Sequence, residues 1–561
     1  MICGEKIDLD TEMIIPTLSA LTFAAVIAIS AGESHAASPN LFGGNPGFKM
    51  ALAENVERVD DLAAFYRARN FEPFWTTNDE QGRNRLNALI LALSTADYHG
   101  LPIDRFNPEA LRTRIAAVRT QRDRGRLEVE ISRTYLDLAR ALSSGLTVPR
   151  EIDPVTMPRD VDIIPADELM RRIEVGDPVV VLRELAPQSP EYVRLMRHRQ
   201  LLQHAVDDGG WGAKVQATRL EPGASGPEVV ALRERLREQG FLARSVSATY
   251  DTQMIAAVSR AQAAMGLRVD GVAGPRTIAA LNVSAADRLG QVLVAMERER
   301  WLPRGRGVGR EIWVNLPDFH TTVLDDGIET FRTVSVIGQA INGKHTPEFS
   351  DTMDHMVINP TWYVPRTIAV RDYLPRLRAN PYAASYMRIT DSRGREVNRS
   401  RGFSQFTARN FPFSMRQPPG PRNALGFVKF MFPNEHAIYL HDSPAKNLYE
   451  EDVRDFSSGC IRLKRPFEFG YHLLAAQEED PEAFFQRILR STNETRINLV
   501  SPIPVHLVYR TAFTDAQGGL NFRDDVYGRD AKVLRALSAE GVVVAPTGTP
   551  GRYMSALGRR E

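Results

Sequence analysis

The chain has 561 residues and a formal net charge of +1, from 70 Lys and Arg against 69 Asp and Glu. At ~150 residues per domain, this length predicts three or four domains. Hydrophobic residues make up 43% of the sequence, which excludes a wholly disordered chain. The balanced charge argues against a generic nucleic-acid-binding protein, because such domains usually carry a basic excess.

Two cysteines, Cys3 and Cys460, are the most informative feature of the composition. Cys3 lies upstream of a segment that we expect to be cleaved, so the mature chain would keep Cys460 alone and form no internal disulfide. A four-cysteine zinc site is excluded as well. The sequence predicts no metal site and no other cofactor.

Residues 1–37 are interpreted as a signal peptide. The apolar run from Leu18 to Ile29 has the length of a signal core and is shorter than the ~20 apolar residues of a membrane-spanning helix. Acidic residues offset Lys6 in the stretch before this run, which is explained if translation starts at Met13. A retained N-terminal anchor is the alternative. Both interpretations place the rest of the chain outside the cytoplasm, and the prediction is a periplasmic protein.

Residues 38–221 are predicted to form a helical scaffold domain. After a linker rich in Gly and Pro, apolar residues recur at three- and four-residue spacing in 86–96, 126–145 and 178–186, which is typical of amphipathic helices. Gly145 is expected to end the second of these helices. This domain holds no cluster of residues with catalytic chemistry, so its predicted role is structural.

Residues 222–282 predict three short helices, which would form a small bundle. Gly240 is expected to end the first helix, and Pro275 takes the first position of the third. The segment ends in D-G-V-x-G-P-x-T at Asp270–Thr277. This pattern resembles the peptidoglycan-binding domain 1 module, and a generic three-helix spacer is the alternative.

Residues 283–537 are predicted to form a mainly β domain, because Val, Ile, Thr and aromatic residues mix with polar ones in several runs. The runs 311–324 and 329–338 carry strand signals and are separated by the hairpin sequence Asp-Asp-Gly. A polar, Arg-rich stretch of about 366–426 interrupts the strands and predicts an inserted lid subdomain. Residues 538–561 are expected to be a weakly ordered tail. The fold class is therefore multidomain α+β.

The chemistry is predicted around Cys460, which follows His441 by 19 residues. A thiol attacks as its thiolate, and a neighbouring imidazole can take the proton. The sequence Ser-Ser-Gly before Cys460 permits a tight turn whose N–H groups could stabilise an oxyanion. Arg462 adds positive charge that favours the thiolate. A structural cysteine is the alternative, but an unpaired thiol in an exported chain indicates a reactive role.

The pattern I-Y-L-H followed by S-x-G-C-x-R resembles the catalytic motif of the L,D-transpeptidase (YkuD-type) family. Further runs resemble the large periplasmic subgroup of that family, at residues 65–75, 296–303, 359–365, 416–426 and 521–528. Many members have His where this chain has Ser458, which leaves His441 as the nearby candidate base. Asp442 follows His441 on a predicted strand and should point to the other face, so the group that orients the imidazole is not predicted.

The resemblance implies that Cys460 is the nucleophile and forms a thioester, and that His441 is the general base and then the general acid. It implies that the N–H groups of Gly459 and Cys460 form part of the oxyanion hole. The side chains implied to contact the substrate are Arg462, Tyr439, Trp362 and Ser458.

The implied substrate is the tetrapeptide stem of peptidoglycan, which would lose its terminal D-Ala while the acyl group passes to an amine. Carbapenems would be covalent inhibitors. The acceptor stays open among another stem, a free D-amino acid, a lipoprotein and water. The alternatives in function are an L,D-carboxypeptidase (hydrolase) with the same site and a non-catalytic wall-binding protein. The sequence does not predict an oligomeric state.

Overall fold

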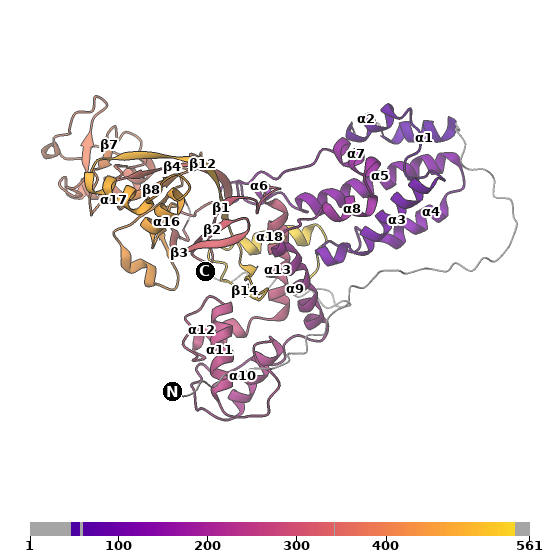
Figure 1. Cartoon of the computed structure of the whole chain (residues 1–561), viewed down its shortest axis with the longest axis horizontal. Coiled ribbons are helices and arrows are strands. Elements are labelled where there is room, and N and C mark those ends of the chain that lie inside the picture. Colours follow the sequence, from indigo (N-terminus) through magenta and orange to yellow (C-terminus); the bar gives the residue numbers. More distant parts are fainter. Residues whose placement is uncertain (1–45, 57–59, 342, 545–561) are drawn as a thin grey trace, which may run out of the picture. The chain divides into compact units, whose positions relative to one another are not determined.

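The structure is a computed structural model that describes residues 46–56, 60–341 and 343–544 (Figure 1). The predicted signal segment 1–37, with Met13, lies outside the described residues. The described chain has a helical N-terminal region and, from Arg310 onward, a β-rich region, as the sequence predicts. No helix in these three described ranges is long and apolar enough to cross a membrane.

The helices of the N-terminal region share one hydrophobic core. Those predicted over 86–96, 126–145 and 178–186 correspond to α3, α5 and α8, and Gly145 with a φ of 94° ends α5. Because Thr120 and Asp123 form a capping box, α5 begins directly after Thr120. The elements are α1 (Pro46–Val56), α2 (Asp60–Ala68), α3 (Glu80–Ser94), η1 (Ala96–His99), α4 (Pro108–Ala117), α5 (Gln121–Ser144), α6 (Pro149–Ile152), α7 (Ala166–Val175), α8 (Pro178–Glu184) and α9 (Pro190–Asp207).

The buried carboxylate of Glu128 on α5 explains why residues 65–75 carry a recognisable motif. It accepts hydrogen bonds from the backbone N–H groups of Phe74 and Trp75 at 2.7 and 2.8 Å, and from the hydroxyl of Tyr66 at 2.9 Å. A buried carboxylate is stable only where such donors replace water. The motif therefore fixes the loop between α2 and α3 onto α5.

The segment 222–282 contains the helices α10 (Pro227–Glu238), α11 (Thr252–Ala264) and α12 (Pro275–Leu281), around a hydrophobic core of their own. Gln262 on α11 is buried and explains the D-G-V sequence. Its Nε2 donates to Asp270 Oδ1 at 2.8 Å, and its Oε1 accepts the N–H groups of Asp270 and Gly271 at 3.1 and 3.0 Å. The amide thereby holds the loop that leads into α12.

Helix α13 (Ala285–Trp301) joins the helical core to the β-rich region. Its side chains lie in the same core as α1–α9, together with Val533, Leu534 and Leu537 of α18 (Arg529–Ala539). This differs from the predicted boundary at residue 283, because the long apolar face of α13 finds its partners among the helices. Arg298 of α13 pairs with Asp530 of α18, and both are buried.

The predicted tail needs a correction. Residues 538–544 are described and packed: Ser538 and Ala539 end α18, and Val542 and Val544 are buried against the helical core. The apolar Val-Val-Val run supplies the burial that the prediction overlooked. Residues 545–561 lie outside the described residues.

The strands of the β-rich region form one sheet in the order β10-β3-β11-β9-β8-β4-β12-β1-β2. The long strand β3 also pairs with β2 through its first half and with β11 near its end, so the sheet closes on itself. The strands are β1 (Arg310–Asn315), β2 (His320–Asp325), β3 (Ile328–Gly338), β4 (Phe349–Ile358), β8 (Val428–Met431), β9 (Leu440–His441), β10 (Asp455–Ser457), β11 (Ile461–Leu463) and β12 (Thr495–Val508).

The hairpin predicted at Asp-Asp-Gly is confirmed, since Asp325 of β2 pairs with Ile328 of β3. The run 311–324, however, forms two antiparallel strands, β1 and β2. Its Leu-Pro-Asp-Phe centre is a turn, with Phe319 at a φ of 54° and its N–H donating to the Leu316 carbonyl at 3.1 Å. Proline cannot donate to a ladder, which is why the pairing breaks there.

Further elements cover the sheet and complete the region. Phe469 of α16 packs edge-on against Phe430 of β8, with 4.7 Å between ring centroids. The elements are η4 (Lys446–Glu450), α16 (Pro466–Leu474), α17 (Pro481–Ser491), β13 (Ala512–Thr514) and β14 (Leu520–Phe522).

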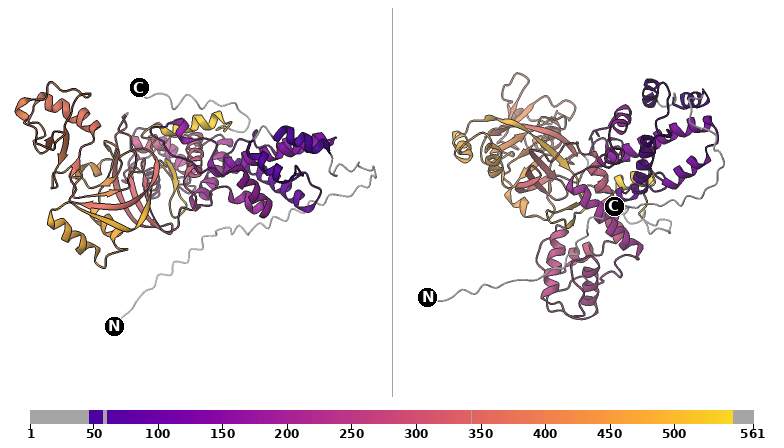
Figure 2. Two further views of the ribbon diagram at one scale, coloured as in Figure 1. Left: turned by 90° about the horizontal axis from the view of Figure 1, so that it is seen from above. Right: turned by 45° about the vertical axis from the view of Figure 1, so that its right-hand side comes forward.

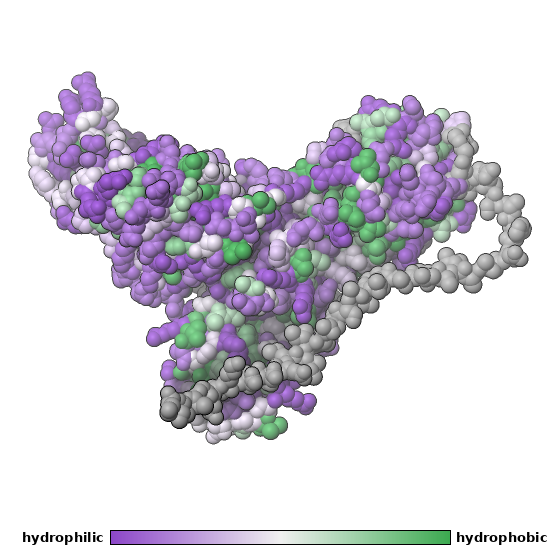
Figure 3. Space-filling view, viewed as in Figure 1, coloured by the Kyte–Doolittle hydropathy of each residue, from purple (hydrophilic) through white to green (hydrophobic). Residues whose placement is uncertain are grey.

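The inserted segment (residues 366–426) has a hydrophobic core of its own, which includes Leu377, Phe403 and Phe411. Its strands pair in a small separate sheet, and its helices are drawn in salmon in the left view of Figure 2. It holds twelve arginines against three carboxylates, and its surface around β7 is largely hydrophilic in Figure 3. Its elements, with the preceding β5, are β5 (Trp362–Tyr363), α14 (Arg366–Ile368), η2 (Ala369–Tyr373), α15 (Leu374–Ala379), β6 (Arg388–Thr390), η3 (Arg399–Arg401) and β7 (Ser414–Gln417).

Candidate active site

The register of two parallel strands brings four of the predicted site residues to one face of the sheet. Strand β11 pairs with β9 so that Ile461 lies beside Leu440 and Arg462 beside His441. Side chains alternate between the faces of a strand. Leu440 and Ile461 are fully buried in the core, so the residues on either side of them point to the opposite face. Those residues are Tyr439 and His441 on one strand and Cys460 and Arg462 on the other.

The backbone carbonyl of Asp442 orients the imidazole of His441. It accepts a hydrogen bond from Nδ1, which leaves Nε2 as the unprotonated nitrogen. The carboxylate of Asp442 is engaged elsewhere: it accepts the N–H groups of Phe427 at 3.0 Å and Ser443 at 2.7 Å and pairs with Lys446. The prediction that the Asp442 side chain points away from the imidazole agrees with these contacts.

The imidazole and the thiol are both neutral in this site. Burial, followed by the charge of Arg462, lowers the pKa of His441 to about 3. Burial raises the pKa of Cys460 to about 11, although Tyr439 and Arg462 act in the opposite direction. The charge of Arg462 thus favours the thiolate, as predicted, but burial outweighs it. The resting site therefore contains a neutral Cys460 thiol and a neutral His441 imidazole rather than a thiolate–imidazolium pair.

The thiol of Cys460 donates to the carbonyl oxygen of Ala437, with 3.6 Å between sulfur and oxygen. In the paired strands Cys460 lies opposite Tyr439, and His441 lies opposite Arg462, so the thiol and the imidazole are diagonal neighbours. The ring centroids of Tyr439 and His441 are 5.6 Å apart. A rotation about the Cα–Cβ bond of Cys460 is the motion that takes the sulfur away from Ala437.

The turn before Cys460 is closed by Ser457. Its Oγ donates to the Cys460 carbonyl at 2.5 Å and accepts the Gly459 N–H at 3.0 Å. The Gly459 N–H is therefore used inside the turn and does not face an oxyanion, contrary to the sequence-based expectation. Within the described part of the chain, the Cys460 N–H has no acceptor. Of the N–H groups of Gly459 and Cys460, that of Cys460 is therefore the one that can donate to a ligand.

A cavity of ≈380 Å³ lies over these residues and is bounded on its other side by the inserted segment. It is lined by all four side chains that the resemblance implied to contact the substrate, namely Trp362, Tyr439, Ser458 and Arg462. Ser458 is exposed, and its Oγ accepts from Arg371 Nη2 at 3.5 Å. The residues that line it and were not predicted for the site include His436, Ala437 and Tyr373.

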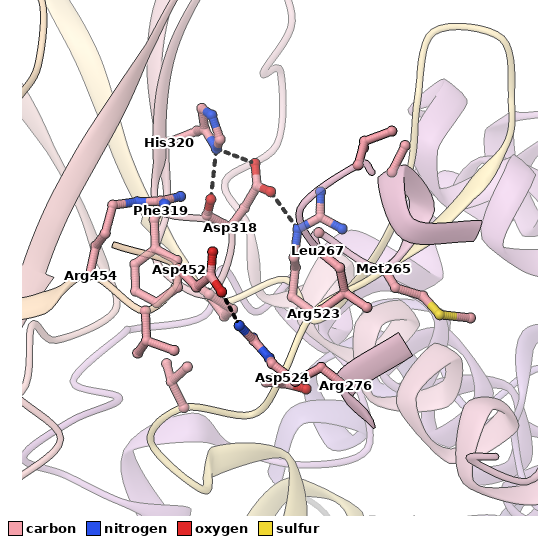
Figure 4. Close-up of a pocket in the computed structure, with 16 residues that line it drawn as sticks. Met265, Leu267, Arg276, Asp318, Phe319, His320, Asp452, Arg454, Arg523 and Asp524 are labelled. Atoms are coloured by element: carbon pink, nitrogen blue, oxygen red, sulfur yellow. Dashed lines mark hydrogen bonds and ion pairs between the residues drawn. The ribbon is translucent and has the colours of Figure 1, made fainter. Parts of the chain in front are cut away.

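A second cavity, of ≈300 Å³, is lined by residues of α11, α12 and β2 and by the loop before β10 (Figure 4). Asp318 is buried there. Burial alone would raise its pKa, but the bonds and charges of His320, Arg523 and Arg332 lower that pKa to about 2. Asp452 pairs with Arg276. Asp318 is held ionised by its cationic neighbours, so it is not suited to acid–base chemistry.

Comparison with known families identifies the region that holds the site. Residues 309–506 match the family described as the L,D-transpeptidase catalytic domain. The β-rich region is therefore similar in sequence to L,D-transpeptidase catalytic domains. Cys460 and His441 both lie inside the matched range. Residues 60–198 match a family described as "Scaffold domain", and residues 225–281 match the "Putative peptidoglycan binding domain".

One curated relative is also described as an L,D-transpeptidase. The "Putative L,D-transpeptidase" of Haemophilus influenzae is 30% identical over 224 residues, which cover 40% of this chain and 45% of the relative. The chain therefore matches less than half the length of that relative.

Two solved L,D-transpeptidase structures each align with 52% of this chain. One from Xylanimonas cellulosilytica is covered to 98% at 17% identity with a TM-score of 0.16, and one from Stackebrandtia nassauensis to 96% at 14% with a TM-score of 0.22.

Proposed function

We propose that this chain is a cysteine-dependent L,D-transpeptidase that remodels or cross-links peptidoglycan stem peptides. The observation that carries the proposal is the single face of β9 and β11 on which Cys460, His441, Tyr439 and Arg462 meet below one cavity. The match of residues 309–506 to the L,D-transpeptidase catalytic domain supports the reaction class. The match of residues 225–281 supports peptidoglycan as the partner.

In the proposed acylation step, the thiol proton moves to Nε2 of His441 as the sulfur attacks the carbonyl carbon before the terminal D-residue. A carbon–sulfur bond forms, and the carbonyl oxygen becomes an oxyanion that accepts the N–H of Cys460. The carbon–nitrogen bond then breaks, and the leaving amine takes the proton from the imidazolium. The products are a thioester on Cys460 and the free D-amino acid.

In the second step, an acceptor amine attacks the thioester carbon and passes its proton to Nε2 of His441. The carbon–sulfur bond breaks and the thiolate regains a proton. Water in place of the amine would give hydrolysis with the same groups. Incubation with a disaccharide-tetrapeptide, followed by mass spectrometry, separates the outcomes. A cross-linked dimer supports transpeptidation, free tripeptide alone supports a carboxypeptidase, and unchanged substrate contradicts the proposed function.

Arg462 is proposed to bind a carboxylate of the acidic stem. Its Nε is buried without a hydrogen-bond partner in the described part of the chain, so a ligand oxygen is the natural acceptor. We expect Arg462→Gln to raise KM for the tetrapeptide about 10- to 100-fold, since a hydrogen bond to a charged group contributes about 1.5–3 kcal/mol. Initial rates give KM and kcat separately.

The control for Arg462 is a substrate in which the stem carboxylates are converted to amides. The wild-type enzyme should bind this analogue weakly, and Arg462→Gln should bind it no worse than the wild type does. An equal rise in KM for both substrates would contradict the proposed contact.

The peptidoglycan-binding segment is proposed to raise the local concentration of wall polymer. Val215 and Asn282 exchange two hydrogen bonds, of 2.9 and 2.8 Å, so excision of residues 216–281 joins two neighbouring points of the chain. We expect this deletion to weaken binding to intact sacculi while leaving kcat/KM on a soluble stem peptide nearly unchanged. Sedimentation with sacculi and initial rates measure the two quantities. A parallel loss of both would assign the segment to the catalytic scaffold.

The proposed location is the periplasm, reached through the N-terminal signal. Peptidoglycan as the proposed substrate is consistent with this location. Fractionation of cells that express the full chain, with N-terminal sequencing of the mature protein, tests it and locates the cleavage point near Ala36.

A further inference from the structure

Three backbone segments meet behind the catalytic turn at the side chain of Thr346. Thr346 is fully buried, and its Oγ1 donates to the Gly459 carbonyl at 2.6 Å. The same oxygen accepts the N–H of Gly338, at the end of β3, at 3.0 Å. The packing is so close that a Cβ on Gly338 would lie 3.1 Å from the Cα of Gly459. One hydroxyl therefore ties the catalytic turn to β3.

The C-terminal part of the β-rich region holds Thr346 in place. The hydroxyl of Tyr527 donates to the Gly338 carbonyl at 2.5 Å and accepts the Thr346 N–H at 3.4 Å. Arg529, 1% exposed, donates to the Thr346 carbonyl at 2.6 Å and to Glu348 Oε1 at 3.0 Å. Every polar group of Thr346 is thus hydrogen-bonded. Tyr527 belongs to the run 521–528, which the proposed reaction does not use. This run therefore helps to hold Thr346 in place.

We propose that Thr346 is a positioning residue that directs the Cys460 N–H toward the oxyanion of the acyl-transfer reaction; this rests on the proposed function. The C=O and N–H groups of a trans peptide point in opposite directions, and no described peptide bond is cis. Because Thr346 holds the Gly459 oxygen on the buried side, the Cys460 N–H points away from Thr346. Gly459 has a φ of 131°, a conformation in which other residues are strained.

If Thr346 did not hold the Gly459 oxygen, the peptide plane between Gly459 and Cys460 could rotate. Without the Thr346 hydroxyl, the Gly459 carbonyl would have no partner in the interior, and turning outward would hydrate it. The same rotation would turn the Cys460 N–H away from the cavity. The thiol itself would stay in place, because the Cys460 carbonyl is still bonded to Ser457. Removal of the Thr346 hydroxyl should therefore weaken oxyanion stabilisation without changing the reactivity of the thiol.

The test compares two reactions of Cys460 in Thr346→Val. In acylation by p-nitrophenyl acetate, the sulfur attacks the carbonyl carbon, an oxyanion forms, p-nitrophenolate leaves, and the thiol proton goes to His441. In alkylation by iodoacetamide, a carbon–sulfur bond forms as iodide leaves, and no oxyanion forms. We expect the acylation rate to fall about 10²-fold, as for the loss of one oxyanion donor, with the alkylation rate unchanged. Thr346→Ser keeps the hydroxyl and should restore acylation.

Tyr527→Phe is the matched control, because it removes a hydroxyl from the same cluster that does not touch Gly459. It should lower the melting temperature and reduce acylation much less than Thr346→Val does, because Thr346 keeps its own hydrogen bond to the Gly459 carbonyl. If circular dichroism shows that Thr346→Val is unfolded, Thr346→Ala is measured in its place and should show the same split between acylation and alkylation.

Three results would overturn the proposal: wild-type acylation in the folded Thr346 variant, a parallel fall in alkylation, or an equal loss of acylation in Tyr527→Phe. A wild-type enzyme that reacts with the ester but not with the tetrapeptide would contradict the proposed function alone. The effect of Thr346 on ester acylation would still be measured, so the two failures are distinguishable.

Discussion

Cys460→Ala is expected to abolish acyl transfer while the chain stays folded. The described residues contain one free cysteine, Cys460, so no second thiol there can take its place. Removal of a nucleophile costs on the order of 10⁶ in kcat, which places the variant below detection in the tetrapeptide assay. Cys460 is only partly buried at the edge of the core, so the loss of one sulfur atom should change the melting temperature little.

A carbapenem gives a second readout for the same variant. The wild-type protein should gain the mass of one inhibitor, and peptide mapping should place the adduct on Cys460. Cys460→Ala should gain nothing, and Cys460→Ser is the matched control because it keeps the shape of the side chain without a thiol. An adduct on Ser457 or Ser458 in any of these proteins would contradict the assignment of the nucleophile.

The sequence predicted the site residues because they are close to one another in two short motifs. A 19-residue separation of His441 and Cys460 is enough to suggest a strand that ends beside a turn, and the resemblance to the catalytic motif implied Tyr439 and Arg462. Thr346 could not be found in this way. It lies 113 residues before Gly459, and its contact is made to a backbone oxygen, which leaves no trace in the motif.

Two other features were outside the reach of sequence patterns. The partner of the His441 imidazole is a backbone carbonyl, that of Asp442, and every residue type offers such an acceptor. The packing of α13 and α18 with the N-terminal helices depends on which of several apolar faces meet. Local periodicity predicts that a helix has an apolar face, but not which part of the chain covers it.

Burial decides the protonation states of the site, and this too required the structure. The sequence analysis relied on the positive charge near Cys460 to favour the thiolate. The structure shows that removal from water acts more strongly than Arg462 on both Cys460 and His441. The two groups are pushed toward their neutral forms, which are the protonation states from which general-base catalysis starts, while the lowered pKa makes the His441 imidazole a weaker base.

His441→Ala is expected to slow acylation about 10²- to 10⁴-fold near neutral pH, the usual effect of a positioned base. The pH dependence of the two proteins should also differ. Because the pKa of Cys460 is raised to about 11, the thiol of the variant is protonated at neutral pH. Its thiolate fraction, and with it the rate, should rise about tenfold per pH unit up to that pKa.

The wild-type enzyme should not show this steep rise. The pKa of His441 is lowered to about 3, so its imidazole stays neutral and can accept the thiol proton well below the usual histidine range. The ratio of wild-type to variant rates should therefore shrink as the pH increases. The rate of alkylation by iodoacetamide as a function of pH measures the pKa of the Cys460 thiol directly. A midpoint near neutral pH in the wild type would mean that a thiolate–imidazolium pair is already formed. His441 would then act by holding a charge rather than by taking a proton.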